Sequence, residues 1–97
     1  MRFEIVFAPE AVEDFGRLAA RDRSTVRDAI ETHLRHDPEK ASRSRIKRLR
    51  ALRSPQYRLR VEEVRVFYDV QEGAVAILAI VPKSGAQQWL DRFGKRE

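Results

Sequence analysis

The sequence contains no cysteine, so disulfide bonds and thiolate metal sites are excluded. It has no apolar run near the roughly 18 residues of a membrane span, and its first residues, MRFEIVFAPE, contain too short an apolar run for a signal peptide. Hydrophobic residues make up 42% of the 97, which argues against disorder. We therefore expect a single domain over residues 1–97, located in the cytoplasm.

Positive charge is concentrated in the middle of the chain. Residues 1–39 carry six basic and nine acidic groups, residues 40–65 carry ten and two, and residues 66–97 carry four of each. The three segments have net charges of −3, +8 and 0, which give the +5 of the whole chain. Such a localised excess favours an acidic partner, and nucleic acid above all.

Hydrophobic periodicity predicts one strand, two helices, three strands and a short helix. We expect a strand at 2–7, helices at 9–20 and 24–36, strands at 57–62, 64–70 and 74–81, and a helix at 84–94. The second helix has Asp22 or Ser24 available as its N-cap. Residues 39–56 read mostly as loop, with a possible strand near 46–49. This order predicts an α+β fold, in which an antiparallel four-stranded sheet carries the N-terminal helical pair on one face and a short helix ends the chain.

The stretch YRLRVEEVRVFYDV (57–70) alternates as a β-hairpin with arginines on one face. Closure at Glu62 and Glu63 pairs Arg60 with Arg65, and closure of the next hairpin at 71–73 pairs Val66 with Leu78. The expected core face is then Tyr57, Leu59, Val61, Val64, Val66, Tyr68, Leu78 and Ile80. The opposite face is expected to carry Arg58, Arg60, Arg65, Phe67, Ile77 and Ala79.

Like charges that face each other on a sheet destabilise it by a few tenths of a kcal/mol up to about 1. A bound polyanion would reverse that effect. The alternative is a solvated face whose arginines are neutralised by Glu62, Glu63 or Asp69.

The segment before the hairpin extends the same charge, because residues 40–53 hold seven basic groups and no acid. Arginine outnumbers lysine in this segment, and arginine suits bidentate contacts to phosphate. An alternative is a loop kept basic for solubility. On the nucleic-acid interpretation, the predicted RNA-binding residues are Arg45, Lys47, Arg48, Arg50 and Arg53.

The sequence IKRLRAL, followed by YRLRVEEVRVFYDV and AILAI, resembles the RelE/ParE superfamily of toxins from type II toxin–antitoxin pairs, with the RelE-like branch favoured. The resemblance covers nearly the whole chain and is most specific over residues 46–81. It implies a toxin that cuts messenger RNA in the ribosomal A site and so inhibits translation. In that branch a ribose 2′-OH attacks the adjacent phosphate without a metal or other cofactor, and clustered cations stabilise the transition state.

The resemblance also implies roles for particular residues. Arg58 and Arg60 match the basic residues of the family's Y-K-x-K strand, Arg65 matches the arginine of its Y-R-V-x-Y strand, and Lys83 supplies a later basic group. Arg60 stands where the family has a general base, although a guanidinium stays protonated in proteins. The family's C-terminal tyrosine is absent, and Trp89 stands nearest. Trp89 either stacks on a base or belongs to the core.

The expected partners are the ribosome, messenger RNA and a small, acidic, DNA-binding antitoxin dimer that forms a hetero-oligomer with the chain. In such pairs the antitoxin covers exposed sheet edges and apolar side chains, here Phe67 and Ile77. Two other functions stay open, a ParE-like inhibitor of DNA gyrase and a nontoxic nucleic-acid-binding module. His33 and His36 lack a third ligand nearby, so we expect no metal site.

Overall fold

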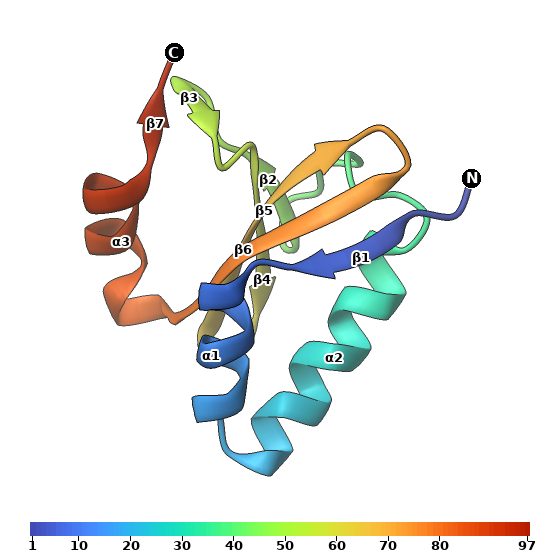
Figure 1. Cartoon of the computed structure of the whole chain (residues 1–97), viewed down its shortest axis with the longest axis vertical. Helices are drawn as coiled ribbons and strands as arrows, with labels where there is room; N and C mark the ends of the chain where they lie inside the picture. The colour runs from blue at the N-terminus through green and yellow to red at the C-terminus, as the bar shows by residue number, and fades with distance from the viewer.

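A computed structural model describes residues 1–97 and confirms the predicted α+β fold (Figure 1). The elements, in chain order, are β1 (Glu4–Phe7), α1 (Pro9–Arg17), α2 (Ala20–Leu34), β2 (Ile46–Arg48), β3 (Leu52–Ser54), β4 (Tyr57–Val61), β5 (Val64–Gln71), β6 (Ala74–Pro82), the 3-10 helix η1 (Lys83–Gly85), α3 (Ala86–Phe93) and β7 (Lys95–Arg96). None of these helices is long and apolar enough to cross a membrane.

The main sheet has five strands in the order β1-β6-β5-β4-β2, and a separate ribbon pairs β3 with β7. The prediction of four antiparallel strands is therefore wrong in two respects. β1 runs parallel to β6, and β2 adds a strand at the opposite edge. Alternation of side chains reveals a strand and its faces but not its direction. The possible strand near 46–49 is confirmed as β2, in which Lys47 and Arg48 follow a single buried residue, Ile46.

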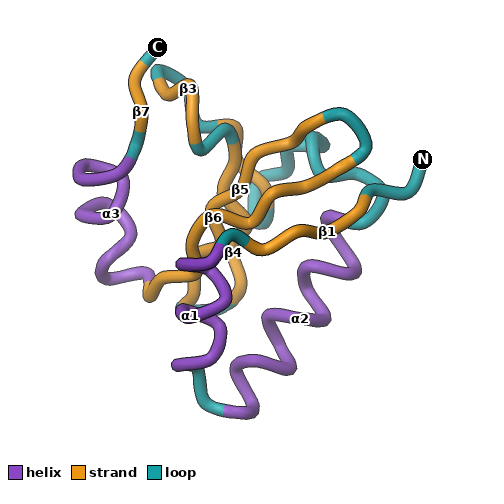
Figure 2. Tube along the Cα trace, in the orientation of Figure 1, coloured by secondary structure: helices purple, strands orange, loops and turns teal.

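Different helices cover the two faces of the sheet (Figure 2). On the core face, α2 buries Val26, Ile30 and Leu34, which recur every four residues along one side of the helix, and each contributes about 1.5–3 kcal/mol when fully buried. On the other face, α3 places Trp89 on Phe67, with ring centroids 5.1 Å apart and planes 10° from parallel. Phe67 is thus covered by the chain itself and needs no partner to bury it.

The break between α1 and α2 lies earlier than predicted. α1 ends at Arg17, and α2 begins at Ala20 with Ala19 as its N-cap and no side-chain capping bond. The prediction of Asp22 or Ser24 as the N-cap is therefore wrong. Leu18 and Ala19 are both extended, and the Arg23 guanidinium donates to the Leu18 carbonyl, so an interaction remote from the cap position stabilises this turn.

A bulge changes the predicted register of β5 and β6. Val66 lies opposite Ile80, but Tyr68 lies opposite Ile77, so Leu78 is an extra residue on β6. Ile77 is consequently buried in the core, and the prediction that it shares the arginine face is wrong. The predicted pairing of Val66 with Leu78 is also wrong, because the turn closes two residues between Gln71 and Ala74.

Tyr68 anchors the loop after α2 to the core. Its side chain is fully buried, and its hydroxyl donates to the Pro38 carbonyl at 2.6 Å. Burial raises the pKa of Tyr68, with smaller contributions from Tyr57 and Glu39, so the hydroxyl keeps the proton that it donates. The Tyr57 ring stacks beside it at 5.4 Å.

We predict that Tyr68→Phe lowers the free energy of unfolding by about 1–3 kcal/mol, because the buried Pro38 carbonyl loses its donor. Urea unfolding at neutral pH measures the change. Tyr57→Phe is the matched control, since the Tyr57 hydroxyl has no protein partner, and it should alter stability by less than about 0.5 kcal/mol. Equal losses in both variants would contradict the anchoring role.

Candidate nucleic-acid interface

Four basic residues share one face of β2, β4 and β5. Lys47 lies opposite Arg58, and Arg60 lies opposite Arg65, as predicted for the second pair. Because side chains alternate along a strand, residues 58 and 60 project to the same side and their cross-strand partners project with them. We call Lys47, Arg58, Arg60 and Arg65 the cation face.

No carboxylate neutralises the cation face. The two ion pairs of the molecule, Asp14 with Arg17 and Glu31 with Arg35, both lie on helices. Glu62, Glu63 and Asp69 form no ion pair with the arginines, so the neutralised-face alternative finds no support. Neighbouring like charges on a sheet are therefore left to repel, which destabilises the fold.

Arg58 is the most constrained member of the cation face. Its side chain is half-buried, and its Nε is buried without a hydrogen-bond partner. Burial lowers the pKa of Arg58, and the charges of Arg65 and Arg60 lower it further. A desolvated cation beside two like charges is unfavourable in the free protein, and an incoming anion would relieve both costs.

Arg65 has a structural role in addition to its charge. It is 6% exposed, and its Nη1 donates to the carbonyls of Glu62 at 2.8 Å and Val64 at 3.0 Å. Glu62 has a φ of 52°, a left-handed conformation that a non-glycine residue adopts at a cost. Arg65 thus stabilises the tight turn between β4 and β5. This structural role is separate from any contact that Arg65 makes with a phosphate.

The basic segment expected to be mostly loop is held as an ordered hairpin, which brings Lys47 into register. Ile46 pairs with Leu59 in the core, and the Ser42 hydroxyl accepts from the Ile46 amide at 3.2 Å where β2 begins. At the far end, Asp69 accepts from the Ser54 hydroxyl at 2.6 Å and from the Gln56 amide at 2.7 Å.

Two predicted RNA-binding residues lie away from the cation face. Arg48 packs its guanidinium 5.3 Å from the Tyr57 ring centroid and donates to the Leu49 and Gln56 carbonyls, on the core side of β2. Arg45 lines a hollow at the end of α2 together with His33, whose pKa is lowered by burial and then by the charge of Arg45. Nucleotide contacts by either arginine stay a prediction.

The remaining predicted residues surround the cation face. Arg50 and Arg53 are exposed on the hairpin that contains β2 and β3. Lys83 is exposed just after β6, and its amide donates to the Glu63 carbonyl at 2.7 Å, beside the β4–β5 turn. Trp89 stacks on Phe67 and contacts Phe93 but stays partly exposed, and base stacking by its indole stays a prediction.

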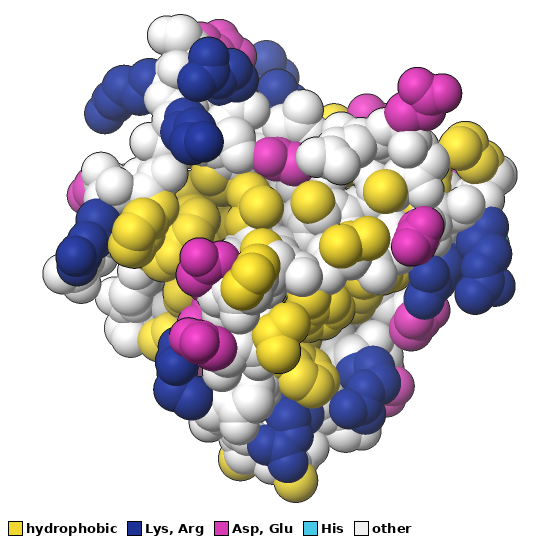
Figure 3. Space-filling view, in the orientation of Figure 1, with side chains coloured by type: hydrophobic (Ala, Val, Ile, Leu, Met, Phe, Trp, Pro, Cys, Tyr) yellow, Lys and Arg dark blue, Asp and Glu magenta, His cyan; other side chains and the backbone are white.

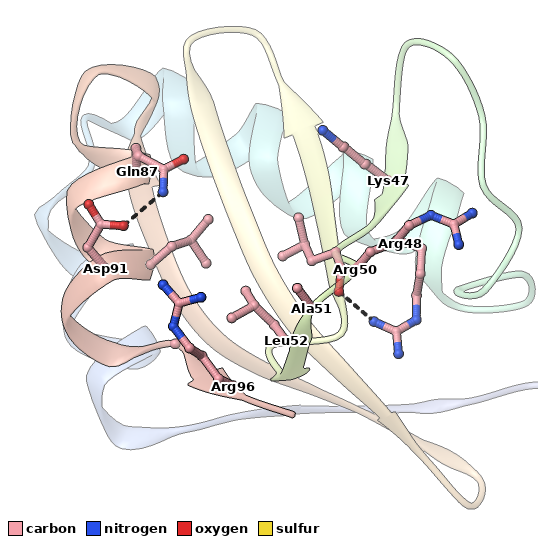
Figure 4. Close-up of a pocket in the computed structure, with 11 residues that line it drawn as sticks. Lys47, Arg48, Arg50, Ala51, Leu52, Gln87, Asp91 and Arg96 are labelled. Atoms are coloured by element: carbon pink, nitrogen blue, oxygen red, sulfur yellow. Dashed lines mark hydrogen bonds between the residues drawn. The ribbon is translucent and has the colours of Figure 1, made fainter.

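A groove lies between α3 and the β2–β4 hairpin, whose connecting loop contains β3 (Figure 4). Its volume is about 460 Å³, and Lys47 of the cation face forms part of its wall. The groove could not be predicted, because nothing in the sequence pattern places α3 on the arginine face. The only available signal was the apolar ridge of Trp89, Leu90 and Phe93, which requires a surface to pack on.

Comparison with known proteins gives one family match. The family of the "ParE toxin of type II toxin–antitoxin system, parDE" matches residues 5–87. No curated protein sequence matches the chain.

Solved structures share the fold at low sequence identity. The RelBE2 toxin–antitoxin complex of Mycobacterium tuberculosis matches with a TM-score of 0.72 and 20% identity, over 84% of this chain and 99% of that one. The RelB–RelE antitoxin–toxin complex of Methanococcus jannaschii matches with a TM-score of 0.65 and 17% identity, over 87% and 96%. The YoeB dimer of Staphylococcus aureus matches with a TM-score of 0.63 and 18% identity, over 84% and 97%.

We predict that Arg58→Met stabilises the fold by about 1 kcal/mol. Methionine keeps the apolar stem and removes both the unpartnered Nε and one of the repelling charges. Thermal unfolding at low salt measures the gain, which should shrink at high salt as repulsion is screened. Arg2→Met, an exposed position at the opposite edge of the sheet, should change stability by less than about 0.5 kcal/mol. Destabilisation by Arg58→Met would mean that the guanidinium is held by favourable contacts.

Proposed function

The chain belongs to the ParE toxin family of type II toxin–antitoxin systems, and from this premise we propose that it blocks translation by cutting messenger RNA in the ribosomal A site. The observation that carries the proposal is the cation face, where four basic residues share one sheet face without a carboxylate partner. Such a surface offers its charge to a phosphate rather than to the protein's own acids.

The proposed reaction is an internal transesterification. The 2′-oxygen forms a bond to the adjacent phosphorus, the bond from phosphorus to the 5′-oxygen breaks, and the products carry a 2′,3′-cyclic phosphate and a 5′-hydroxyl. The phosphorane transition state bears extra negative charge, which the cation face stabilises electrostatically. Arg58 supports this role most directly, since it is already partly desolvated and forms no ion pair with a carboxylate.

Proton transfer in this reaction does not rest on arginine, because a guanidinium stays protonated in proteins. The 2′-hydroxyl proton passes to water while Arg60 stabilises the developing alkoxide. Lys83, exposed beside the β4–β5 turn, is the candidate donor to the leaving 5′-oxygen. Electrostatic stabilisation without a dedicated base implies slow cleavage.

An antitoxin is the expected protein partner, as in the RelB–RelE and YoeB–YefM complexes. Hydrophobic side chains are exposed across the face of the molecule that carries β1 and α1, with Lys and Arg mostly at its rim (Figure 3). Val6 on β1 is 46% exposed and Val12 on α1 is 55% exposed. An acidic, amphipathic segment that covers this patch and reaches the cation face would neutralise the toxin.

The first experiment adds the purified chain to a translation reaction and maps 5′ ends on the messenger RNA. We predict breaks at the A-site codon, and a rate reduced about 100-fold or more in Arg60→Ala, because an exposed cation that stabilises the transition state is lost. Arg2→Ala is the matched control and should cleave at the normal rate. Intact messenger RNA at stoichiometric amounts of folded protein would refute the proposal.

Inhibition of DNA gyrase is the second candidate, favoured by the family match itself. If this function holds, toxicity in cells persists in Arg60→Ala and cleaved DNA accumulates on gyrase. If messenger RNA cleavage holds, the same variant is harmless and no such complexes form. The amount of covalent DNA–gyrase complex after induction of the wild-type chain and of Arg60→Ala distinguishes the two candidate functions.

A further inference from the structure

The groove between α3 and the β2–β4 hairpin combines two surfaces of different chemistry. Its apolar residues are Leu49, Ala51, Leu52 and Leu90, and its available cations are Lys47, Arg50 and Arg96. Arg48 also lines the groove, but its guanidinium is held by the Leu49 and Gln56 carbonyls. A volume of about 460 Å³ falls in the range of about 300–1,000 Å³ that is typical of small-molecule sites. An apolar surface with a cationic rim suits a nucleotide, whose base is flat and apolar on its faces and whose phosphate is anionic.

The groove is continuous with the cation face. Lys47 lines the groove and also lies opposite Arg58 on neighbouring strands. Strands that pair in a sheet are about 4.8 Å apart, so a phosphate on the cation face leaves the next nucleotide of a single strand within reach of the groove. In Figure 4, α3 forms one wall of the groove and the hairpin forms the other.

The wall formed by α3 presents hydrogen-bond acceptors. Gln87 Nε2 donates to Asp91 Oδ1 at 3.0 Å, and both residues line the groove. A carboxylate can only accept, so the amide nitrogen of Gln87 must face Asp91. Gln87 Oε1 and Asp91 Oδ2 are then left as acceptors, and they are suited to a base that offers N–H groups.

We propose that this groove binds the nucleotide next to the phosphate on the cation face and prefers a base with an exocyclic amino group over uracil. Cytosine offers its N4 amino group to a carboxylate acceptor. Uracil has a carbonyl oxygen at the same position, which the acceptors of Gln87 and Asp91 repel. This inference rests on the proposed function, since it requires that the chain bind single-stranded RNA.

The test compares two RNA hexamers, oligo(C) and oligo(U), both 2′-O-methylated so that they cannot be cleaved. Fluorescence anisotropy with the full chain should give a Kd about fivefold or more lower for oligo(C), the order expected for a hydrogen-bonded base contact. Asp91→Asn should bring the ratio close to one, because an amide can also donate to the uracil carbonyl. Asp91 is exposed on α3, so this substitution leaves the fold intact.

Glu72→Gln is the matched control, because it makes the same change of charge at an exposed position in the β5–β6 turn. It should keep the wild-type ratio. Equal binding of both hexamers, with binding still weakened by Arg60→Ala, would overturn the groove proposal and leave the cation face standing. No binding of either hexamer would overturn both.

An unchanged ratio in Asp91→Asn would also overturn the proposal, since the preference for cytosine would then come from elsewhere. If the same variant weakened binding of the purified antitoxin instead, the groove would belong to the protein partner.

Discussion

The antiparallel register of β2, β4 and β5 determines where the charges of this molecule lie. Ile46, Leu59 and Val66 form one cross-strand row that must be buried beneath the helices. Once that row faces the core, the residues beside it in each strand must face the other way. The repulsion of the cation face is thus imposed by the same pairing that builds the core, and apolar burial beneath the sheet offsets it.

The opposite face of the sheet divides into two regions with different roles. Over β5 and β6, α3 covers Phe67 and Ala79, so this half is closed by the chain itself. Over β2 and β4, Lys47 and Arg60 are exposed and Arg58 is half-buried, and Lys47 also lines the groove beside α3. A polyanion that binds there meets cations that the sheet already holds side by side and partly desolvated. Little reorganisation of these side chains therefore opposes binding. The repulsion that destabilises the free toxin is therefore relieved when a polyanion binds to the cation face.

Most of the fold and the centre of the site follow from the sequence because alternation in residues 57–70 is strict. To predict that Arg60 pairs with Arg65, only the position of the β4–β5 turn had to be known. The predicted register of β5 and β6 was wrong, because a bulge cannot be recognised in a continuous apolar run such as AVAILAIV. The position of Lys47 opposite Arg58 could not be predicted, because β2 has a single buried residue and too little alternation to fix its partner strand. No sequence pattern indicated that Asp91 lines a groove, because its surroundings depend on where α3 packs against the sheet.

The salt dependence of RNA binding shows whether the cation face holds the phosphate. For single strands, the logarithm of the association constant falls with the logarithm of salt concentration by about 0.7 for each phosphate contacted. For an uncleavable RNA, we predict that this slope becomes shallower by about 0.7 in Arg60→Ala and is unchanged in Arg2→Ala. The same slope in all three proteins would contradict it, because the phosphate would then bind elsewhere.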